Sequence, residues 1–144
     1  MLKYELVKAN KKDINRLIEY KRKTIFEYAN NLDKDEIKKI NTYIDNSVSK
    51  EINNYYKIVI KGKTVGCLLT ENKDDGILID ELYLESEYRN KKIGSNIIEN
   101  IIDNNKIVYL WVYKLNEKAI KLYKRLGFTI IEETDTRLHM KKSC

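Results

Sequence analysis

A short polar segment in the second half of the sequence has the composition of a phosphate-binding loop. It covers residues 88–95, with the sequence YRNKKIGS, and lies between an apolar run and an amphipathic one. At a helix start, free backbone N–H groups and the helix dipole attract anions. Gly94 would let a ligand approach the backbone closely, while Arg89, Lys91 and Lys92 add positive charge. The segment therefore predicts a pyrophosphate site.

Two consecutive carboxylates interrupt an otherwise apolar run. Asp80 and Glu81 lie within residues 77–84. A buried carboxylate without a partner is costly, so we expect one of them to face a wet cleft. An amine is mostly protonated at neutral pH, and a carboxylate that takes its proton, directly or through water, would let it attack. Glu81, nearer the polar loop, is the candidate base; the alternative is that both acids are exposed at a strand bulge or paired with lysine.

The first third of the chain predicts a strand followed by two helices. Residues 2–8 have the pattern of a strand. Asn10 and Asp13 are typical of the cap and first turn of a helix. Asp33, with Glu36 three residues later, indicates a capping box at the start of the second helix.

The remaining residues alternate between strands and helices. Strands are predicted at 56–60, 64–70, 77–84, 107–113, 128–133 and 136–141, and helices at 93–102 and 117–126. The run 107–113 is almost entirely apolar, which favours a strand covered on both faces, with Trp111 in the core. This order predicts one α/β domain over residues 1–144, with a mixed sheet and helices on both faces.

Two motifs in this order resemble the GNAT superfamily of N-acetyltransferases. Residues 89–94, RNKKIG, resemble its R/Q-x-x-G-x-G/A signature, with Lys92 at the first glycine. Residues 116–128, NEKAIKLYKRLGF, resemble its second common segment, N-x-x-A-x-x-L-Y-x-x-x-G-F. The resemblance covers about residues 60–141 by motif and the rest by element order. It implies the GNAT fold, whose mixed, mostly antiparallel sheet has splayed central strands.

The resemblance also implies that acetyl-CoA is the cosubstrate. Residues 82–84 would bind its pantetheine arm through their backbone, and the Leu84 N–H is the candidate donor to the oxyanion. If the loop needs a positive φ at Lys92, the strain is on the order of 1 kcal/mol, and we expect altered but retained binding. The expected cofactor-binding residues are Leu82, Tyr83, Leu84, Arg89, Asn90, Lys91, Lys92, Ile93, Gly94, Ser95 and Asn116.

Tyr123 stands where many GNAT enzymes keep a tyrosine that protonates the departing CoA thiolate. The alternative is a packing role, because Ala119, Leu122, Tyr123 and Leu126 also form an apolar helical stripe. The resemblance thus implies an N-acetyltransferase in which an amine attacks acetyl-CoA directly in a ternary complex. Its catalytic candidates are Tyr123, Glu81 and Leu84, with neither a metal nor a covalent intermediate.

The sequence does not identify the acceptor amine. The family places the acceptor against the two N-terminal helices, where Tyr20, Phe26, Tyr28 and Tyr43 would either line a pocket or belong to the core. A polyamine, an aminoglycoside, an amino acid and a peptide or protein N-terminus all stay open. A non-catalytic acyl-CoA-binding module is the alternative function, suggested by Lys92 in the glycine position.

Composition favours a cytoplasmic protein without nucleic-acid or membrane partners. The net charge is +6, but the basic residues form no clustered arm and the aromatic residues do not interleave with a basic stripe. The 2 cysteines give neither a disulfide framework nor metal-ligand spacing. No secretion signal and no apolar run of roughly 20 residues is present. A homodimer is common among soluble proteins and stays open.

Overall fold

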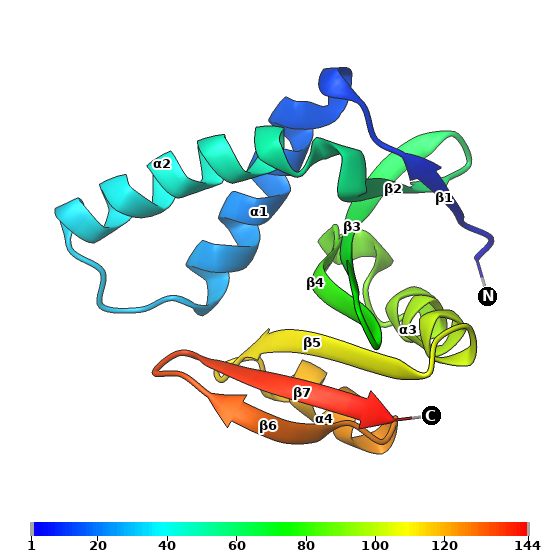
Figure 1. Cartoon of the computed structure of the whole chain (residues 1–144). Helices are drawn as coiled ribbons and strands as arrows, with labels where there is room; N and C mark the ends of the chain where they lie inside the picture. The colour runs from blue at the N-terminus through cyan, green and yellow to red at the C-terminus, as the bar shows by residue number, and fades with distance from the viewer. Residues whose placement is uncertain (1, 144) are drawn as a thin grey trace.

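A seven-stranded sheet runs through the computed structural model, which describes residues 2–143 (Figure 1). Its strands are β1 (Glu5–Lys8), β2 (Tyr55–Ile60), β3 (Lys63–Lys73), β4 (Gly76–Leu84), β5 (Ile107–Tyr113), β6 (Thr129–Glu133) and β7 (Arg137–Ser143). The helices are α1 (Ile14–Tyr28), α2 (Lys34–Lys50), α3 (Ile93–Asp103) and α4 (Glu117–Arg125). The spatial order is β1-β2-β3-β4-β5-β7-β6, and β4 with β5 is the parallel pair. The predicted mixed, mostly antiparallel α/β fold is confirmed.

Local sequence signals explain where several elements begin and end. Asn10 forms a capping box at the short 3-10 turn that leads into α1, and Asp33 forms one with Glu36 at the start of α2. Asn116 caps α4 by accepting a hydrogen bond from the N–H of Ala119. Each predicted helix and strand is present, with boundaries that differ by a few residues.

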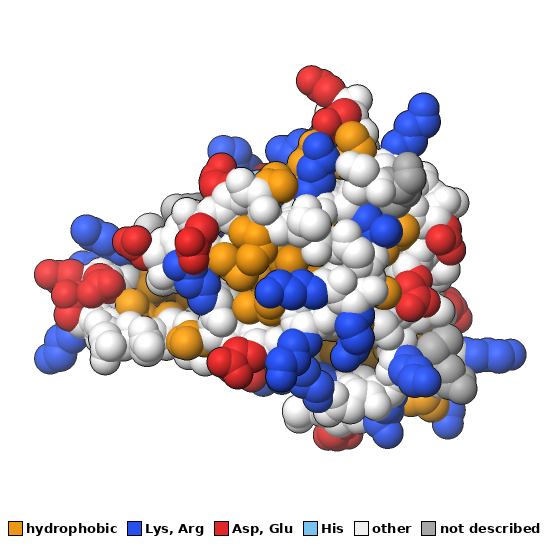
Figure 2. Space-filling view, turned by 90° about the horizontal axis from the view of Figure 1, so that it is seen from below, with side chains coloured by type: hydrophobic (Ala, Val, Ile, Leu, Met, Phe, Trp, Pro, Cys, Tyr) orange, Lys and Arg blue, Asp and Glu red, His pale blue; other side chains and the backbone are white. Residues whose placement is uncertain are grey.

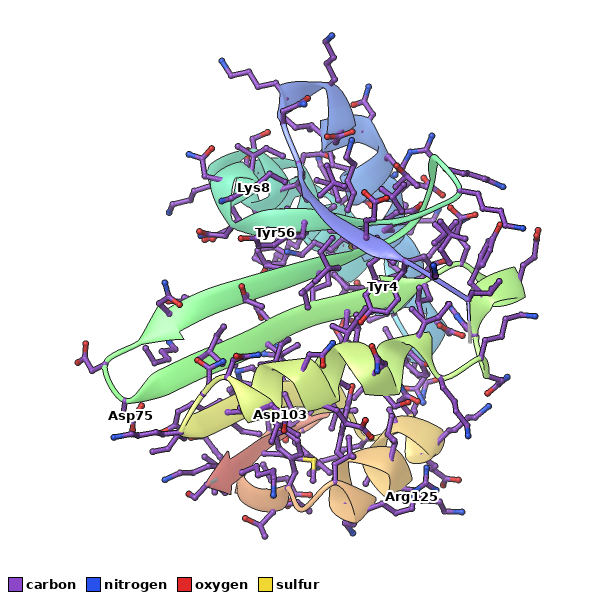
Figure 3. All side chains as sticks on the ribbon, turned by 90° about the vertical axis from the view of Figure 1, so that its right-hand side faces the viewer. Tyr4, Lys8, Tyr56, Asp75, Asp103 and Arg125 are labelled. Atoms are coloured by element: carbon purple, nitrogen blue, oxygen red, sulfur yellow. The ribbon has the colours of Figure 1, made fainter. Side chains whose placement is uncertain are left out.

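Two apolar cores lie on opposite faces of the sheet. The first packs α3 and α4 against the sheet, and its buried members include Ile58, Ile79, Ile93, Ile97, Val108, Leu110, Phe128 and Met140. The second packs α1 and α2 against β2, β3 and β4, and its buried members are Leu17, Tyr20, Val48, Tyr55, Cys67, Leu69 and Tyr83. Figure 3 shows α3 lying across the sheet, where Asn96 of α3 accepts a 2.6 Å hydrogen bond from the hydroxyl of Tyr4. The helices on both faces were expected from the sequence.

The two central strands separate after a short paired stretch. β4 and β5 are in register only where Ile77–Ile79 face Val108–Leu110, although β4 continues to Leu84 and β5 to Tyr113. Figure 1 shows β4 and β5 diverging toward the side of the molecule on which α1 lies. The predicted splay of the central strands is therefore present, and it leaves one edge of β4 without a neighbouring strand.

A β-bulge in β4 changes the face on which its side chains lie. Leu69 of β3 is opposite Glu81, whereas the next residue, Thr70, is opposite Ile79, so Asp80 is the extra residue. Ile79 and Leu82 both pack on the core beneath α3, which places Asp80 and Glu81 together on the opposite face. Regular alternation would have put these two carboxylates on opposite faces.

One prediction about β5 is wrong. Val108, Leu110 and Val112 are buried, but Tyr109, Trp111 and Tyr113 alternate with them and are only half-buried. The strand is thus covered fully on one face only, and Trp111 is not a core residue. The cause is that α1 and α2 pack on β2, β3 and β4 and leave this face of β5 uncovered.

The surface carries charges of both signs. Figure 2 views the molecule from below, and on this face Lys and Arg side chains lie among acidic ones, with hydrophobic side chains gathered near the middle. The basic side chains therefore do not form a continuous stripe on this face. Within residues 2–143, no helix is both long and apolar enough to cross a lipid bilayer.

Candidate active site

Two cavities meet where β4 and β5 separate. The first, with a volume of about 500 Å³, lies between α1, α2 and the strands β4, β5 and β7, and we call it the α1–β5 cavity. The second, of about 740 Å³, lies between the end of β4, residues 88–95 and α4, and we call it the loop cavity. Five residues line both cavities: Thr24, Tyr28, Leu82, Asn116 and Tyr123. The two cavities therefore adjoin at these residues.

The loop between β4 and α3 contains two left-handed residues. Asn90 has φ 61° and Lys92 has φ 67°, a region that residues with a side chain rarely adopt. Lys92 therefore has the conformation for which the signature's glycine is suited. A Cβ at Gly94 would lie 3.8 Å from Leu84, so packing within the protein does not require glycine there. The space that Gly94 leaves at the N-terminus of α3 suits an approaching anion.

A basic helix face lines the other wall of the loop cavity. Lys118, Lys121 and Arg125 of α4 project along it, and the ammonium of Lys118 donates to the side-chain oxygen of Asn90. Figure 3 labels Arg125 on α4. No motif in the sequence points to these residues, although spacings of three and four residues place them on one helix face. With Lys92 they give the loop cavity a positive wall that fits a polyphosphate.

Two backbone amides of β4 face the gap beside β5. The N–H of Glu85 donates to the carbonyl of Val65 in β3 at 2.8 Å, so alternate residues before Glu85 also direct their amides to β3. Leu82 and Leu84 lie between those positions, and their N–H groups point to the opposite edge. Consistent with this, Arg89 Nε donates to the Leu84 carbonyl from outside the sheet at 2.7 Å. Both amides can therefore hydrogen-bond a ligand that lies along β4.

The structure gathers most of the predicted cofactor residues in one place. Leu82, Tyr83, Leu84, Arg89, Asn90, Lys92, Ile93, Gly94, Ser95 and Asn116 all line the loop cavity. Lys91 is exposed and lies outside the cavity lining. Arg89 also ties the loop to α1, because its guanidinium lies 3.4 Å from a carboxylate oxygen of Glu27.

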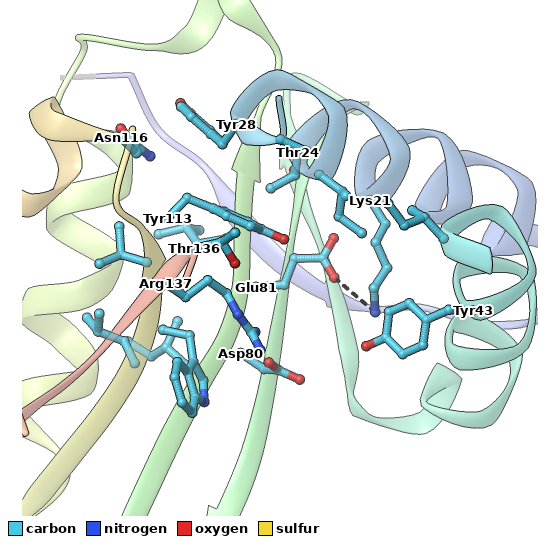
Figure 4. Close-up of a pocket in the computed structure, with 18 of the residues that line it drawn as sticks. Lys21, Thr24, Tyr28, Tyr43, Asp80, Glu81, Tyr113, Asn116, Thr136 and Arg137 are labelled. Carbon is cyan, nitrogen blue, oxygen red and sulfur yellow. Dashed lines mark ion pairs between the residues drawn. The ribbon is translucent and has the colours of Figure 1, made fainter. Parts of the chain in front are cut away.

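Asp80 and Glu81 both line the α1–β5 cavity, but their surroundings differ (Figure 4). Asp80 is exposed, whereas Glu81 is only 9% exposed. Oε2 of Glu81 accepts a 2.7 Å hydrogen bond from Tyr55 and lies 4.0 Å from Lys21 Nζ. Burial raises the pKa of the Glu81 carboxyl, while Lys21 and then Tyr55 act to lower it. A carboxylate with a raised pKa in a cavity wall is a suitable proton acceptor.

Tyr123 lies at the junction of the two cavities. It projects from α4, is half-buried, and packs edge-on against Phe128 with ring centroids 5.9 Å apart. Burial raises the pKa of its phenol to about 12, with a smaller contribution from Tyr28. The phenol is therefore protonated at neutral pH and has a proton to donate. Tyr123 packs on Phe128 and also lines both cavities, and its role as an acid stays a prediction.

Aromatic and basic side chains form much of the α1–β5 cavity. Of the four aromatic candidates from the two N-terminal helices, Tyr28 and Tyr43 line it, while Tyr20 and Phe26 do not. Tyr20 instead belongs to the core and donates a 2.5 Å hydrogen bond to Glu85. Five further lining residues were not predicted from the sequence: Lys21, Lys39, Trp111, Tyr113 and Arg137. Trp111 and Tyr113 could be predicted as lining residues only if it were known which face of β5 is uncovered.

Comparison with known proteins agrees with this geometry. Residues 51–130 match the acetyltransferase (GNAT) domain family. An uncharacterized N-acetyltransferase of Methanocaldococcus jannaschii is 28% identical over 107 residues, which is 66% of this chain and 47% of that protein. A spermine/spermidine N(1)-acetyltransferase of Bacillus subtilis is 28% identical over 71 residues, covering 45% of this chain and 47% of that protein. The chain thus spans about half the length of these curated relatives.

Solved structures show the same fold. A PaiA N-acetyltransferase from Thermoplasma acidophilum, in complex with coenzyme A, superimposes with a TM-score of 0.78 and 21% identity, covering 99% of this chain and all of that one. Arabidopsis thaliana Naa50, in complex with a bisubstrate analogue, gives a TM-score of 0.64 and 22% identity, covering 98% of this chain and 99% of that one. Since the domain match extends over more than half of the sequence, the chain belongs to the GNAT acetyltransferase domain family.

Proposed function

We propose that this protein is an N-acetyltransferase that moves an acetyl group from acetyl-CoA to a primary amine. The observation that carries the proposal is the meeting of the two cavities at Leu82, Asn116 and Tyr123. Acetyl-CoA would occupy the loop cavity and the amine the α1–β5 cavity, so that the thioester and the amine meet at that junction. Direct attack in a ternary complex then needs no covalent enzyme intermediate.

The loop cavity has the features that acetyl-CoA requires. Its pyrophosphate would bind at the N-terminus of α3, near Gly94 and the left-handed residues Asn90 and Lys92. The basic face of α4 supplies charge for the phosphates. The pantetheine arm carries amide groups that match the amides on the free edge of β4. These residues support acetyl-CoA as the cosubstrate.

Three groups would act on the reaction. Glu81, directly or through a water molecule, takes a proton from the ammonium or the attacking nitrogen. An amide of β4 stabilises the oxyanion that forms when nitrogen bonds to the thioester carbon. When the carbon–sulfur bond breaks, Tyr123 donates its proton to the thiolate. Leu84 was the sequence-based candidate for the amide donor; Leu82 lines both cavities and is a second candidate nearer the junction.

The proposal is tested by measuring CoA thiol release from acetyl-CoA with polyamines, aminoglycosides, amino acids and short peptides. We expect turnover with at least one class of amine and a fall in kcat of about 100-fold for Tyr123→Phe, with acetyl-CoA binding unchanged. The substitution keeps the ring that packs on Phe128. Tyr56→Phe, outside both cavities, is the matched control and should retain full activity.

The same experiment separates the alternative function. If acetyl-CoA binds but no amine is acetylated, the protein is a non-catalytic acyl-CoA-binding module and the enzyme proposal fails. If turnover occurs but is unchanged in Tyr123→Phe, acetyl transfer stands and the role of Tyr123 as the acid fails. A cytoplasmic location, where acetyl-CoA is available and a free thiol such as the buried Cys67 stays reduced, belongs to the same proposal.

A further inference from the structure

Arg137 lies at the wall of the α1–β5 cavity beside an aromatic ring. It begins β7, and its guanidinium carbon lies 4.7 Å from the ring centre of Trp111 in β5. Trp111 in turn stacks on His139, with centroids 4.2 Å apart, and His139 Nδ1 donates to the Leu110 carbonyl at 3.0 Å. A guanidinium placed over an aromatic ring is attracted by the ring, which restricts the positions that its N–H donors can take.

The Arg137 guanidinium forms no close ion pair within the described part of the chain, although it is among the charges that lower the pKa of the Asp80 carboxyl, which burial raises. Within residues 2–143, no carboxylate lies within 4.0 Å of it, and its side chain donates no hydrogen bond. Figure 4 shows Arg137 reaching into the cavity, toward the side on which Asp80 and Glu81 lie. Five N–H donors arranged in this way match the two oxygens of a carboxylate.

The other charges of the cavity point to an acceptor that carries both signs. Its carboxylates are Asp80 and Glu81, and its cations are Lys21, Lys39 and Arg137. Lys21 lies 4.0 Å from Glu81, so much of its charge is already matched. A polyamine carries only positive charge and would be repelled by the remaining cations. A molecule with one amine and one carboxylate would instead place its amine at Glu81 and its carboxylate at Arg137.

We propose that the acceptor is a small amino carboxylate, whose carboxylate is bound by Arg137 while its amine faces Glu81 and the thioester. This assignment rests on the proposed acetyl-transfer function. The aromatic lining fits the carbon chain between the two ends, and a cavity of about 500 Å³ has the size of a small-molecule site. Arg137 is thus a specificity-determining residue for the acceptor.

The test compares amines that differ only at the far end. For one series of chain lengths, ω-amino carboxylates are compared with the matching carboxamides and diamines in the CoA-release assay. At the best chain length we expect the carboxylate to exceed the carboxamide in kcat/KM by roughly tenfold or more. In Arg137→Gln this advantage should disappear, through loss of activity on the carboxylate and not on the carboxamide, whereas Arg137→Lys should keep part of it.

A matched control lies on the same strand. Lys141 of β7 is also placed over an aromatic ring of β5, 5.7 Å from the centre of Tyr109, but lies outside the cavity lining. Lys141→Gln should leave the carboxylate preference unchanged. Thermal unfolding of each variant checks that Arg137→Gln is folded. If it is not folded, Arg137→Lys tests the inference instead: a reduced preference for the carboxylate supports it, and an unchanged preference contradicts it.

A second readout does not depend on turnover. Trp111 is the only tryptophan of the sequence, so its fluorescence reports on ligands near Arg137. In wild-type protein the amino carboxylate should change this fluorescence at lower concentration than the carboxamide does, and Arg137→Gln should remove the difference. If the carboxylate and the carboxamide changed the fluorescence of wild-type protein at the same concentration, the assignment of Arg137 as the carboxylate-binding residue would be overturned.

The outcomes separate this inference from the proposed function. If carboxamides or diamines are acetylated as well as carboxylates, or if the preference persists in Arg137→Gln, the inference fails and the acetyltransferase stands. If no amine is acetylated but the carboxylate still binds through Arg137, the acetyltransferase fails and the carboxylate site stands. If neither turnover nor carboxylate-dependent fluorescence is seen, both fail.

Discussion

The phenol of Tyr55 donates a 2.7 Å hydrogen bond to Oε2 of Glu81, from a position with no exposure to solvent. The thiol of Cys67 lies 3.7 Å from the other oxygen, Oε1. Together with Lys21, these contacts stabilise the ionised carboxylate, while burial disfavours it and has the larger effect. The protonation of Glu81 is therefore set by groups that line the core as well as by the cavity itself.

Removing these contacts should move the acid limb of the pH–activity profile. Lys21 and Tyr55 lower the pKa of Glu81, so their loss raises it, and the ionised base appears only at higher pH. We expect kcat/KM to rise with pH through the Glu81 pKa in wild type, and the midpoint to move upward in Tyr55→Phe and further in Lys21→Gln. One amine is used for all variants, so its own ionisation is common to every profile.

An unchanged midpoint in both variants would show that another group limits the rate at low pH. Glu81→Gln provides the reference for that case, because it cannot accept a proton at this position. Its activity should be low at every pH and should lack the limb that Tyr55→Phe and Lys21→Gln displace.

Tyr123 gives a prediction at the opposite end of the pH range. Its phenol has a pKa raised to about 12, so it keeps its proton throughout the neutral and mildly alkaline range. The ratio of wild-type kcat to that of Tyr123→Phe should therefore stay constant from about pH 7 to pH 10. A ratio that declines toward unity within this range, measured by CoA release, would show that the phenol loses its proton well below pH 12 and would contradict the raised pKa.

The left-handed conformation of Lys92 should cost stability. Lys92→Gly removes the clash between Cβ and the backbone, whereas Lys91→Gly makes the same change at a neighbour whose φ is not positive. Both variants gain the same freedom in the unfolded chain. We expect the free energy of unfolding of Lys92→Gly to exceed that of Lys91→Gly by about 1 kcal/mol in urea denaturation without ligand. Equal stabilities would mean that the loop relaxes at residue 92.

The basic face of α4 should contribute to acetyl-CoA affinity through charge. Replacing Lys118, Lys121 and Arg125 together by glutamine should raise the Kd for acetyl-CoA roughly tenfold or more at low ionic strength. The difference in Kd between wild type and the triple variant, measured by calorimetric titration, should become smaller as the salt concentration rises, because ions screen these charges.

The matched control for this triple variant changes net charge equally but elsewhere. Lys11, Lys12 and Lys34 are exposed and lie outside both cavities. Replacing them by glutamine should leave the Kd nearly unchanged. An equal loss of affinity in both triple variants would assign the effect to the overall charge of the protein.

Much of the fold could be predicted from local patterns in the sequence. Helix caps such as Asp33 and the apolar periodicities depend on nearest neighbours along the chain, and these local signals survive into the folded structure. The polar loop at residues 88–95 was found for the same reason, because its residues are contiguous and their type alone indicates an anion site. The basic residues of α4, Lys118, Lys121 and Arg125, were not predicted as part of the site, because a basic helix face more often faces solvent.

The sequence by itself determined the order of the elements, the composition of the loop and the presence of two carboxylates in one strand. The tertiary structure decided how these come together. The bulge at Asp80 turns Glu81 to the same face, and the parting of β4 from β5 opens the junction at which Tyr123 lies. Arg137 reaches the cavity only because β7 pairs with β5 in one register, which places it beside Trp111. Strand register, bulges and uncovered faces depend on contacts between distant segments, which no local pattern encodes.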